Sequence, residues 1–459
     1  MIAGAMVRRA QLVAALAVAA ALGCDPGPES GAAGEEGPAA EIAWSEAIPT
    51  VATVSWSGEA DGGFVEVGRA GGAWRRIAAE RQADGDWRAV VVGLRQGTDY
   101  QLRAGTIGED GSETLGPAVD VTTGGASAKL PDLFLDADAV ADDPGLLATT
   151  FMGGSSYAVL LDADGLVTWW YANPYEGRVM TRTLPSRSGR SVFIDVARSI
   201  DLDSEGNFGL LEVAWDGTLL RWIETSALHH DFLELPSGDL VFLSDEKRVI
   251  DGVGYSGDLV VVLGGDGMEH TLWSAWDYYD PTQFAGQHDF AHANALRYDE
   301  STDTLWLGVH NANQLLQLDP TTGAVRKRVF GRDTDYPLSD GSGPLSQHNF
   351  TLLPSGVLIH DNRDAAGLPA RVVEFALTES PAGAAQVWEY EPTDAFTVAA
   401  FGDALRLADG DTIAVWGSAG VIDRVDADGA LRTRFSGGLG TAFGYAQWLD
   451  DLQPLPQAE

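Results

Sequence analysis

The segments His230-Asp-Phe-Leu-Glu-Leu-Pro-Ser-Gly238 and His348-Asn-Phe-Thr-Leu-Leu-Pro-Ser-Gly356 superimpose without a gap. In each, a histidine stands eight residues before a glycine, with an alternating apolar stretch between them. Such alternation is typical of a β-strand with one buried face, and Pro-Ser-Gly supplies a turn. The chain therefore repeats a strand-and-turn unit that starts with a histidine.

Further copies of this unit lie along the chain. His292-Ala-Asn-Ala-Leu-Arg-Tyr-Asp-Glu300 fits with a slightly longer turn, Gly402-Asp-Ala-Leu-Arg-Leu-Ala-Asp-Gly410 carries glycine in place of histidine, and Val179 begins a weaker copy. Successive copies are 51, 62, 56 and 54 residues apart. This period fits a four-stranded propeller blade, and helical repeats are shorter and lack such strands.

A second signature follows each copy, an apolar strand that runs into an aspartate-glycine turn. Examples are Leu160-Leu-Asp-Ala-Asp-Gly165, Leu318-Asp-Pro-Thr-Thr-Gly323 and Val425-Asp-Ala-Asp-Gly429. Such turns join the strands of hairpins. We count five blades between Val179 and Phe435, and a sixth forms if residues 145–174 pair with the segment from Phe443 to Leu449, which leaves no free sheet edge. The prediction is an all-β protein with a six-bladed β-propeller at residues 130–455, with seven blades as the alternative count.

The histidines predict a site on the propeller axis. All eight lie between His229 and His360. The innermost strands of a propeller line its central channel, so His230, His292 and His348 should face one another there. A single histidine at a strand start is more often structural, but three at one register indicate a functional site.

The N-terminal residues predict export and anchoring. A basic start, an apolar run over residues 10–22 and the ending Ala21-Leu-Gly-Cys24 are typical of a bacterial lipoprotein signal peptide. Residues 1–23 would be removed, Cys24, the only cysteine, would carry the lipid, and residues 24–42 would form a flexible tether. We therefore expect a protein anchored in the cell envelope that faces the periplasm or the exterior. The alternative is an ordinary signal peptide with an incidental cysteine.

The negative charge of the chain disfavours anionic partners. The formal net charge is −38, which opposes binding to nucleic acid and to anionic membrane surfaces. An anion-binding site would have to be built locally, from imidazoles, arginines and backbone N–H groups.

Residues 43–123 form a separate unit. Pro49–Trp56 alternates as a strand, and the segment Gly93-Leu-Arg-Gln-Gly-Thr-Asp-Tyr100 resembles the fibronectin type III signature. The resemblance implies a β-sandwich in which Trp56 fills the core and Tyr100 makes the tyrosine corner. We expect a spacer or docking module, because the unit holds no cluster of titratable residues.

The histidine segments themselves resemble the bacterial arylsulfotransferase family. The ordered set is His229–Gly238, Asp289-Phe-Ala-His-Ala-Asn294, Gln347-His348, His360-Asp-Asn362 and Arg371-Val-Val-Glu-Phe375. The resemblance implies a six-bladed propeller that moves a sulfuryl group from a small phenolic sulfate ester to a phenol, without the nucleotide donor PAPS and through a sulfohistidine. By the same resemblance His348 matches the nucleophile, and His230 and His292 match the histidines that contact the sulfate and move protons. The further substrate-binding candidates are His229, Asn294, His310, Asn362 and Arg371. No metal or organic cofactor is required.

One position departs from the family pattern. The family carries an arginine where this chain reads Leu307-Gly-Val-His310. Histidine does not replace the permanent charge and forked donors of arginine, although His310 could donate if protonated and Arg371 could supply charge. Two alternatives therefore stay open: a non-catalytic propeller lipoprotein that binds a ligand or a protein in the same funnel, and a metal-dependent enzyme, since four imidazoles in the channel could hold a transition metal. The HxxxH spacing from His288 to His292 is weak support for zinc, because it falls at a strand entry rather than on a helix.

Overall fold

A computed structural model describes residues 37–125, 130–135, 145–153, 155–198, 208–284, 288–339, 343–438 and 440–450. The predicted signal peptide, the lipid-attachment residue Cys24 and residues 24–36 of the predicted tether lie outside the described residues. Within that part of the chain β-strands dominate, accompanied by short helical turns. The turns are α1 (Ala275–Tyr278), η1 (Pro281–Gln283), η2 (Asp364–Ala366) and η3 (Gly417–Ala419). No helix of the described ranges is long and apolar enough to cross a bilayer.

Six antiparallel sheets form the propeller, as the repeat predicted. In blades 2 to 6 the strands follow chain order from the inner to the outer edge, except that blade 6 ends on a strand from before the propeller, β9 (Leu133–Leu135). Blade 2 holds β13 (Arg178–Val179), β14 (Thr183–Pro185), β15 (Ser191–Arg198), β16 (Phe208–Ala214) and β17 (Leu219–Thr225). Blade 3 holds β18 (Leu228–Glu234), β19 (Leu240–Ile250), β20 (Val253–Leu263) and β21 (Glu269–Ser274). Blade 4 holds β22 (Ala293–Asp299), β23 (Thr304–Val309), β24 (Gln314–Leu318) and β25 (Val325–Val329).

The last two blades bring the chain back to its beginning. Blade 5 holds β26 (Gln347–Leu353), β27 (Gly356–Asp361), β28 (Arg371–Glu379) and β29 (Ala382–Tyr390). Blade 6 holds β30 (Asp403–Arg406), β31 (Thr412–Trp416), β32 (Val421–Val425) and β33 (Leu431–Gly437), with β9 (Leu133–Leu135) on its outer edge. The aspartate-glycine turns join outer strands, as expected: β11 to β12, β24 to β25 and β32 to β33.

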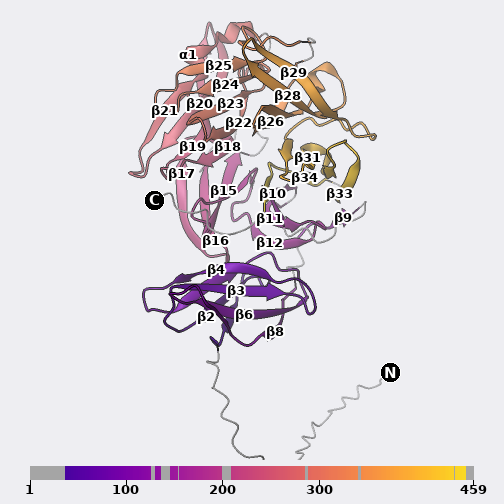
Figure 1. The fold of residues 1–459 in the computed structure, drawn as a ribbon. Helices are drawn as coiled ribbons and strands as arrows, with labels where there is room; N and C mark the ends of the chain where they lie inside the picture. The colour runs from indigo at the N-terminus through magenta and orange to yellow at the C-terminus, as the bar shows by residue number, and fades with distance from the viewer. Residues whose placement is uncertain are drawn as a thin grey trace, which may run out of the picture. The chain divides into compact units, whose positions relative to one another are not determined.

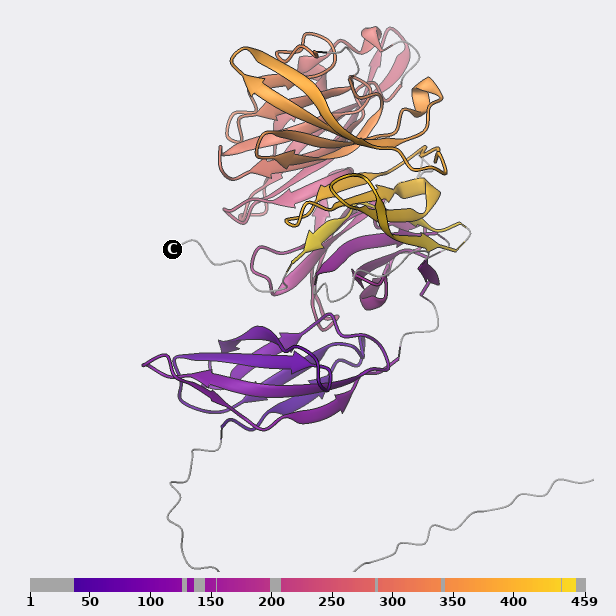
Figure 2. The ribbon, with the colours of Figure 1, turned by 45° about the vertical axis from the view of Figure 1, so that its right-hand side comes forward.

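Blade 1 is built from both ends of the propeller sequence. Its outer strands are β10 (Leu146–Met152), β11 (Tyr157–Asp162) and β12 (Val167–Ala172), and its innermost strands are β34 (Ala442–Phe443) and β35 (Gln447–Leu449). Figure 1 and Figure 2 show the yellow C-terminal strands beside the magenta β10. This is the predicted closure, and it pairs the inner edge of β10 with backbone partners from the far end of the chain.

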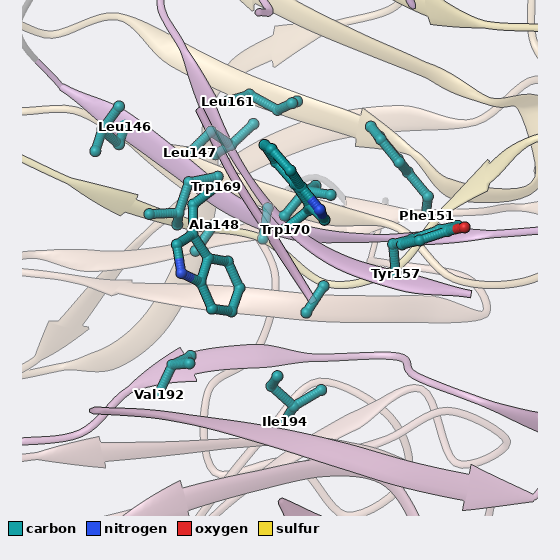
Figure 3. Close-up of a cluster of buried hydrophobic side chains, with 14 of the residues drawn as sticks. Leu146, Leu147, Ala148, Phe151, Tyr157, Leu161, Trp169, Trp170, Val192 and Ile194 are labelled. Atoms are coloured by element: carbon teal, nitrogen blue, oxygen red, sulfur yellow. The ribbon is translucent and has the colours of Figure 1, made fainter. Parts of the chain in front are cut away.

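Large apolar side chains fill the space between blades. Figure 3 shows residues of β10, β11 and β12 packed with Val192 and Ile194 of β15 in blade 2. Trp169 is fully buried there, and its indole nitrogen donates a hydrogen bond to the backbone oxygen of Trp215 (2.8 Å). The Trp169 side chain thus packs its apolar rings between the blades and places its one polar atom against a backbone acceptor.

The N-terminal unit is antiparallel. Its strands are β1 (Glu41–Trp44), β2 (Ala52–Trp56), β3 (Gly62–Gly68), β4 (Arg75–Arg81), β5 (Trp87–Val91), β6 (Asp99–Ile107), β7 (Glu113–Leu115) and β8 (Val119–Thr122). They follow the order β1-β2-β5-β4-β3-β6-β7, with β8 also on β6, and only two residue pairs join β4 to β5. Trp56 is buried in the unit's core, and the Tyr100 hydroxyl accepts a hydrogen bond from the backbone N–H of Arg95 (3.0 Å).

Candidate functional site

Imidazole rings from three consecutive blades meet on the propeller axis. The ring centroid of His230 lies 4.8 Å from that of His292 and 6.2 Å from that of His348, and His292 and His348 are 6.1 Å apart. Side-chain nitrogens of all three lie within 4.8 Å of one another. Figure 1 shows the strands concerned, β18, β22 and β26, next to one another in the propeller. The repeat therefore brings these rings together as the sequence predicted.

The register of one ring differs from the prediction. In each of β18, β22 and β26 a buried Asp or Asn lies one residue before the inner ladder resumes and marks equivalent positions. These residues are Asp231, Asn294 and Asn349, which precede Phe232, Ala295 and Phe350. By that measure Ala293 corresponds to His230 and His348, and His292 lies one residue earlier. The sequence match of the His292 copy, made with a slightly longer turn, did not detect this shift, because a β-bulge absorbs it.

Local backbone geometry turns two of the rings toward the axis. His230 and His292 have φ values of 55° and 54°, in the left-handed region that residues other than glycine seldom adopt. The strand pairing shifts between His229 and Phe232 and again between Ala293 and Ala295. Strained backbone of this kind is retained where the surrounding structure imposes it, frequently at functional sites.

His292 is the ring of the three whose pKa is raised. Its Nδ1 lies 2.5 Å from a carboxylate oxygen of Asp289. Burial alone would lower the pKa of His292, but the hydrogen bond and charge of Asp289, with the charges of Asp258 and Asp364, outweigh burial and raise that pKa above its usual value. Burial likewise acts to raise the pKa of Asp289, and the bond to His292 outweighs it, so the Asp289 pKa is lowered. The contact therefore favours the protonated form of His292 and the ionised form of Asp289.

His230 and His348 are neutral. Burial, followed by the charges of neighbouring histidines, lowers the pKa of each well below its usual value. The Nδ1 atom of His348 is buried without a hydrogen-bond partner in the described structure, and the residue as a whole is only 4% exposed. A neutral imidazole keeps one unprotonated ring nitrogen, which is the atom that nucleophilic chemistry at this residue needs.

His310 joins the cluster from the end of β23. Its ring centroid lies 5.0 Å from that of His292 and 5.2 Å from that of His348. Its Nδ1 lies 2.8 Å from Oδ1 of Asn311, whose Nδ2 donates to the backbone oxygen of Asp289. Burial is the first cause that lowers the pKa of His310, to about 4. At neutral pH this residue therefore supplies no positive charge, so it does not replace an arginine electrostatically.

The other predicted substrate-binding residues lie around this cluster and have partners of their own. His229 Nδ1 lies 2.8 Å from His230 Nδ1, and Asn294 donates from Nδ2 to the backbone oxygen of Gln347 (2.8 Å). Asn362 Oδ1 lies 2.9 Å from Nδ1 of His360, a fully buried ring behind the site. These three residues are placed to position rings or strands.

Arg371 lies within blade 5. Its guanidinium pairs with Asp361 (2.9 Å) and Glu389 (2.6 Å). Both carboxylates belong to neighbouring strands of the same sheet. These pairs occupy its donors with protein acceptors, so a contact between Arg371 and a substrate stays a prediction.

Sequence reasoning did not assign a role to Asp289, Asp258 or Asn311. Asp289 stands three residues before His292, a spacing that could have suggested the bond. Asp258 belongs to β20, so only the folded sheet brings it to the rings. Asn311 is the neighbour of His310 in the sequence, but its bond to the Asp289 backbone oxygen appears only in the fold. Asp258 is fully buried, 3.4 Å from Nε2 of His229, and burial raises its pKa to about 8.

Fold and site together define an all-β, six-bladed propeller whose axis carries a cluster of imidazoles with one carboxylate-bound member. A family model for arylsulfotransferase (ASST) matches residues 136–430, and the chain belongs to this family. No curated protein matches the chain.

The following solved structures resemble this chain only weakly in sequence and in fold. A protein of unknown function from Bacteroides caccae has 12% identity and a TM-score of 0.38, with 73% of this chain and 96% of that chain covered. Virginiamycin B lyase from Staphylococcus aureus has 13% identity and a TM-score of 0.35, covering 66% and 88%. A 6-phosphogluconolactonase-like protein from Bacteroides uniformis has 13% identity and a TM-score of 0.39, covering 85% and 100%. Likeness at this level carries no argument about the site.

Proposed function

We propose that the chain is a PAPS-independent arylsulfotransferase, which moves a sulfuryl group from a phenolic sulfate ester to a phenol through a sulfohistidine at His348. The observation that carries the proposal is a neutral imidazole, His348, whose ring centroid lies 6.1 Å from that of His292, the ring bonded to Asp289. The family of the chain supplies the substrate classes, an aryl sulfate donor and a phenolic acceptor.

In the first half-reaction the Nε2 lone pair of His348 attacks sulfur, and an N–S bond forms as the S–O bond to the phenol breaks. The departing phenolate takes the Nε2 proton of His292. Asp289 keeps that imidazolium populated in the resting site, because its carboxylate raises the His292 pKa. A positioned acid of this kind contributes about 10²–10⁴-fold to a rate.

The second half-reaction returns the site to its starting state. An acceptor phenol attacks sulfur, the N–S bond breaks, and the phenolic proton passes to the now neutral His292. Sulfuryl transfer resembles phosphoryl transfer in its loose transition state, so positioning and electrostatics supply most of the catalysis. The His292 imidazolium, 6.1 Å from the His348 ring, is the local positive charge in a strongly acidic chain.

The test uses p-nitrophenyl sulfate as donor and phenol as acceptor. We expect nitrophenol release that depends on the acceptor, a sulfuryl adduct on the peptide that contains His348, and loss of both in His348→Ala. His270→Ala is the matched control, because His270 lies exposed on β21 outside the cluster. A folded wild-type protein that turns over with none of a range of phenols would overturn the proposal and favour a ligand-binding propeller.

We also propose that Cys24 is lipidated and anchors the protein in the bacterial envelope, with the catalytic domain facing the periplasm or the exterior. The lipobox-like sequence that ends at Cys24 supports this. Expressed in a bacterial host, the wild type should enter the detergent phase of a Triton X-114 partition and Cys24→Ala should not. Equal partitioning of the two proteins would refute the anchor.

The N-terminal unit is proposed to be a fibronectin type III-like sandwich that serves as a spacer. Its strand order, the buried Trp56 and the bond from the Arg95 N–H to the Tyr100 hydroxyl support that assignment. Residues 37–125 expressed alone should give a cooperative unfolding transition and a β-rich circular dichroism spectrum. An unfolded fragment would count against an independent domain.

A further inference from the structure

The histidine cluster has the donor set of a transition-metal site. His230, His292 and His348 each offer one ring nitrogen, and these atoms lie within 4.8 Å of one another. Zinc bound by imidazoles has Zn–N distances of about 2.0–2.1 Å, which place tetrahedral ligands roughly 3.3 Å apart. A contraction of about 1.5 Å or less would close the three nitrogens around one ion, within the reach of side-chain rotation.

Partners outside the cluster turn the correct ring atom inward. Asp289 engages Nδ1 of His292 at 2.5 Å, and His229 engages Nδ1 of His230 at 2.8 Å. In His292 and His230 Nε2 is therefore the ring nitrogen left to bind an ion. Nδ1 of His348 is buried without a hydrogen-bond partner in the described structure. A histidine that binds a metal through one nitrogen almost always gives the other N–H to a carboxylate, a carbonyl or water, so Asp289 fits the role of an outer-shell partner.

The charge beside the rings also favours a cation. The Asp289 carboxylate, whose pKa is lowered, lies 2.5 Å from Nδ1 of His292. Arg371 was predicted to supply positive charge for an anionic substrate. Its guanidinium pairs with Asp361 and Glu389 instead. Nitrogen-only ligands suit zinc, copper and nickel, whereas magnesium and calcium prefer oxygen.

We propose that His230, His292 and His348 bind one divalent transition-metal ion of the zinc class, with a fourth coordination position open beside His310. If the proposed sulfuryl transfer also holds, the ion blocks it, because it occupies the Nε2 atom that attacks sulfur. Zinc would then be an inhibitor whose removal by a chelator restores transfer.

The test measures binding without any sulfate ester, so its outcome does not depend on the proposed activity. Protein without an affinity tag is stripped with a chelator and titrated with Zn²⁺ by calorimetry. We expect one site per chain, no competition from Mg²⁺, and an intense visible spectrum when Co²⁺ replaces Zn²⁺, as for four- or five-coordinate cobalt. His270→Ala should bind like the wild type.

Two variants locate the site. His292→Ala should lose saturable Zn²⁺ binding, and Asp289→Asn should weaken it by about 10–100-fold, the usual cost of losing an outer-shell partner. Circular dichroism checks that each variant is folded, and Asp289→Asn keeps the side-chain volume should His292→Ala fail to fold. The absence of stoichiometric binding to the wild type, or wild-type binding by both variants, would overturn the proposal.

Discussion

His292 and His348 carry the same side chain, yet their surroundings shift their pKa values in opposite directions. Asp289 lies 2.5 Å from His292 and raises its pKa, whereas burial and neighbouring rings hold the pKa of His348 well below the usual value. Two rings with oppositely shifted pKa values therefore lie 6.1 Å apart. In the proposed reaction this difference lets one ring donate a proton while the other attacks as a neutral nucleophile.

Asp289→Asn tests this division of charge. The substitution removes the carboxylate that raises the His292 pKa, so His292 loses its proton at a lower pH. Because the first half-reaction needs the imidazolium, the rate of transfer falls as the pH rises through that pKa. We expect the alkaline limb of the pH–rate profile to move to lower pH and activity at neutral pH to fall about 10–100-fold.

Initial rates over a range of pH values measure the effect. Asp266→Asn is the matched control, since Asp266 lies in the exposed turn between β20 and β21, and it should leave the profile unchanged. A lower rate with an unmoved alkaline limb would show that Asp289 positions His292 without setting its charge.

Sequence alone could find the rings but not their charge states. Equal spacing to a turn glycine identified His230 and His348, because each begins the innermost strand of its own blade. The pKa of each ring depends instead on side chains from other strands, such as Asp258 on β20, which no local pattern ties to the histidines. Arg371 shows the same limit. The sequence identified it as a suitable side chain for substrate binding, but its partners, Asp361 and Glu389, appear only in the folded sheet.

Among the strands, β18 shows how a bulge serves both site and stability. The irregular pairing between His229 and Phe232 lets His230 face the axis while Asp231 is fully buried. The Asp231 carboxylate lies 2.9 Å from Arg182 and 3.1 Å from Arg297, and it accepts the backbone N–H of Leu296 (2.8 Å). One carboxylate thus connects blades 2, 3 and 4 next to the proposed site.

Asp231→Ala should destabilise the propeller by about 3–5 kcal/mol, because it leaves the buried Arg182 guanidinium without this carboxylate and Arg297 with Asp403, 3.6 Å away, as its remaining carboxylate partner. Urea unfolding followed by tryptophan fluorescence measures the change. Asp428→Ala, in the exposed turn after β32, is the control and should stay within about 0.5 kcal/mol of the wild type. Equal midpoints for the two variants would show that the buried carboxylate contributes no net stability.

The strand pattern predicted five blades directly. The sixth was predicted because pairing residues 145–174 with the C-terminal segment leaves no free sheet edge. What it missed is the one-residue offset of His292 in blade 4, where Asn294 occupies the bulge. Bulges change the register without changing the alternation of apolar residues enough to be seen in the sequence. The sequence could therefore assign His292 to its blade and to the axis, but not to its exact backbone position.

At the scale of the whole molecule, the site depends on ring closure. The C-terminal segment supplies the innermost strands of blade 1, and the Tyr445 hydroxyl, fully buried, donates to the backbone oxygen of Asn294 in blade 4 (2.9 Å). The backbone N–H of Ala446 donates to Asp403 of blade 6 (3.0 Å). The segment between β34 and β35 therefore contacts the innermost strands of blades 4 and 6, so closure and site geometry should be lost together.

Phe443→Ala tests this coupling. Phe443 is fully buried on β34 and packs edge-on against Phe151 of β10, with ring centroids 5.5 Å apart. Loss of a buried phenylalanine costs about 3–5 kcal/mol. Because the ring of blades is closed at a single place, we expect one cooperative unfolding transition, shifted to a lower urea concentration. Secondary structure and Zn²⁺ binding should disappear at the same midpoint. Phe134→Ala on β9, where the side chain is 56% exposed, should change little. If blade 1 instead melts alone while Zn²⁺ binding persists, closure does not hold the histidines in place.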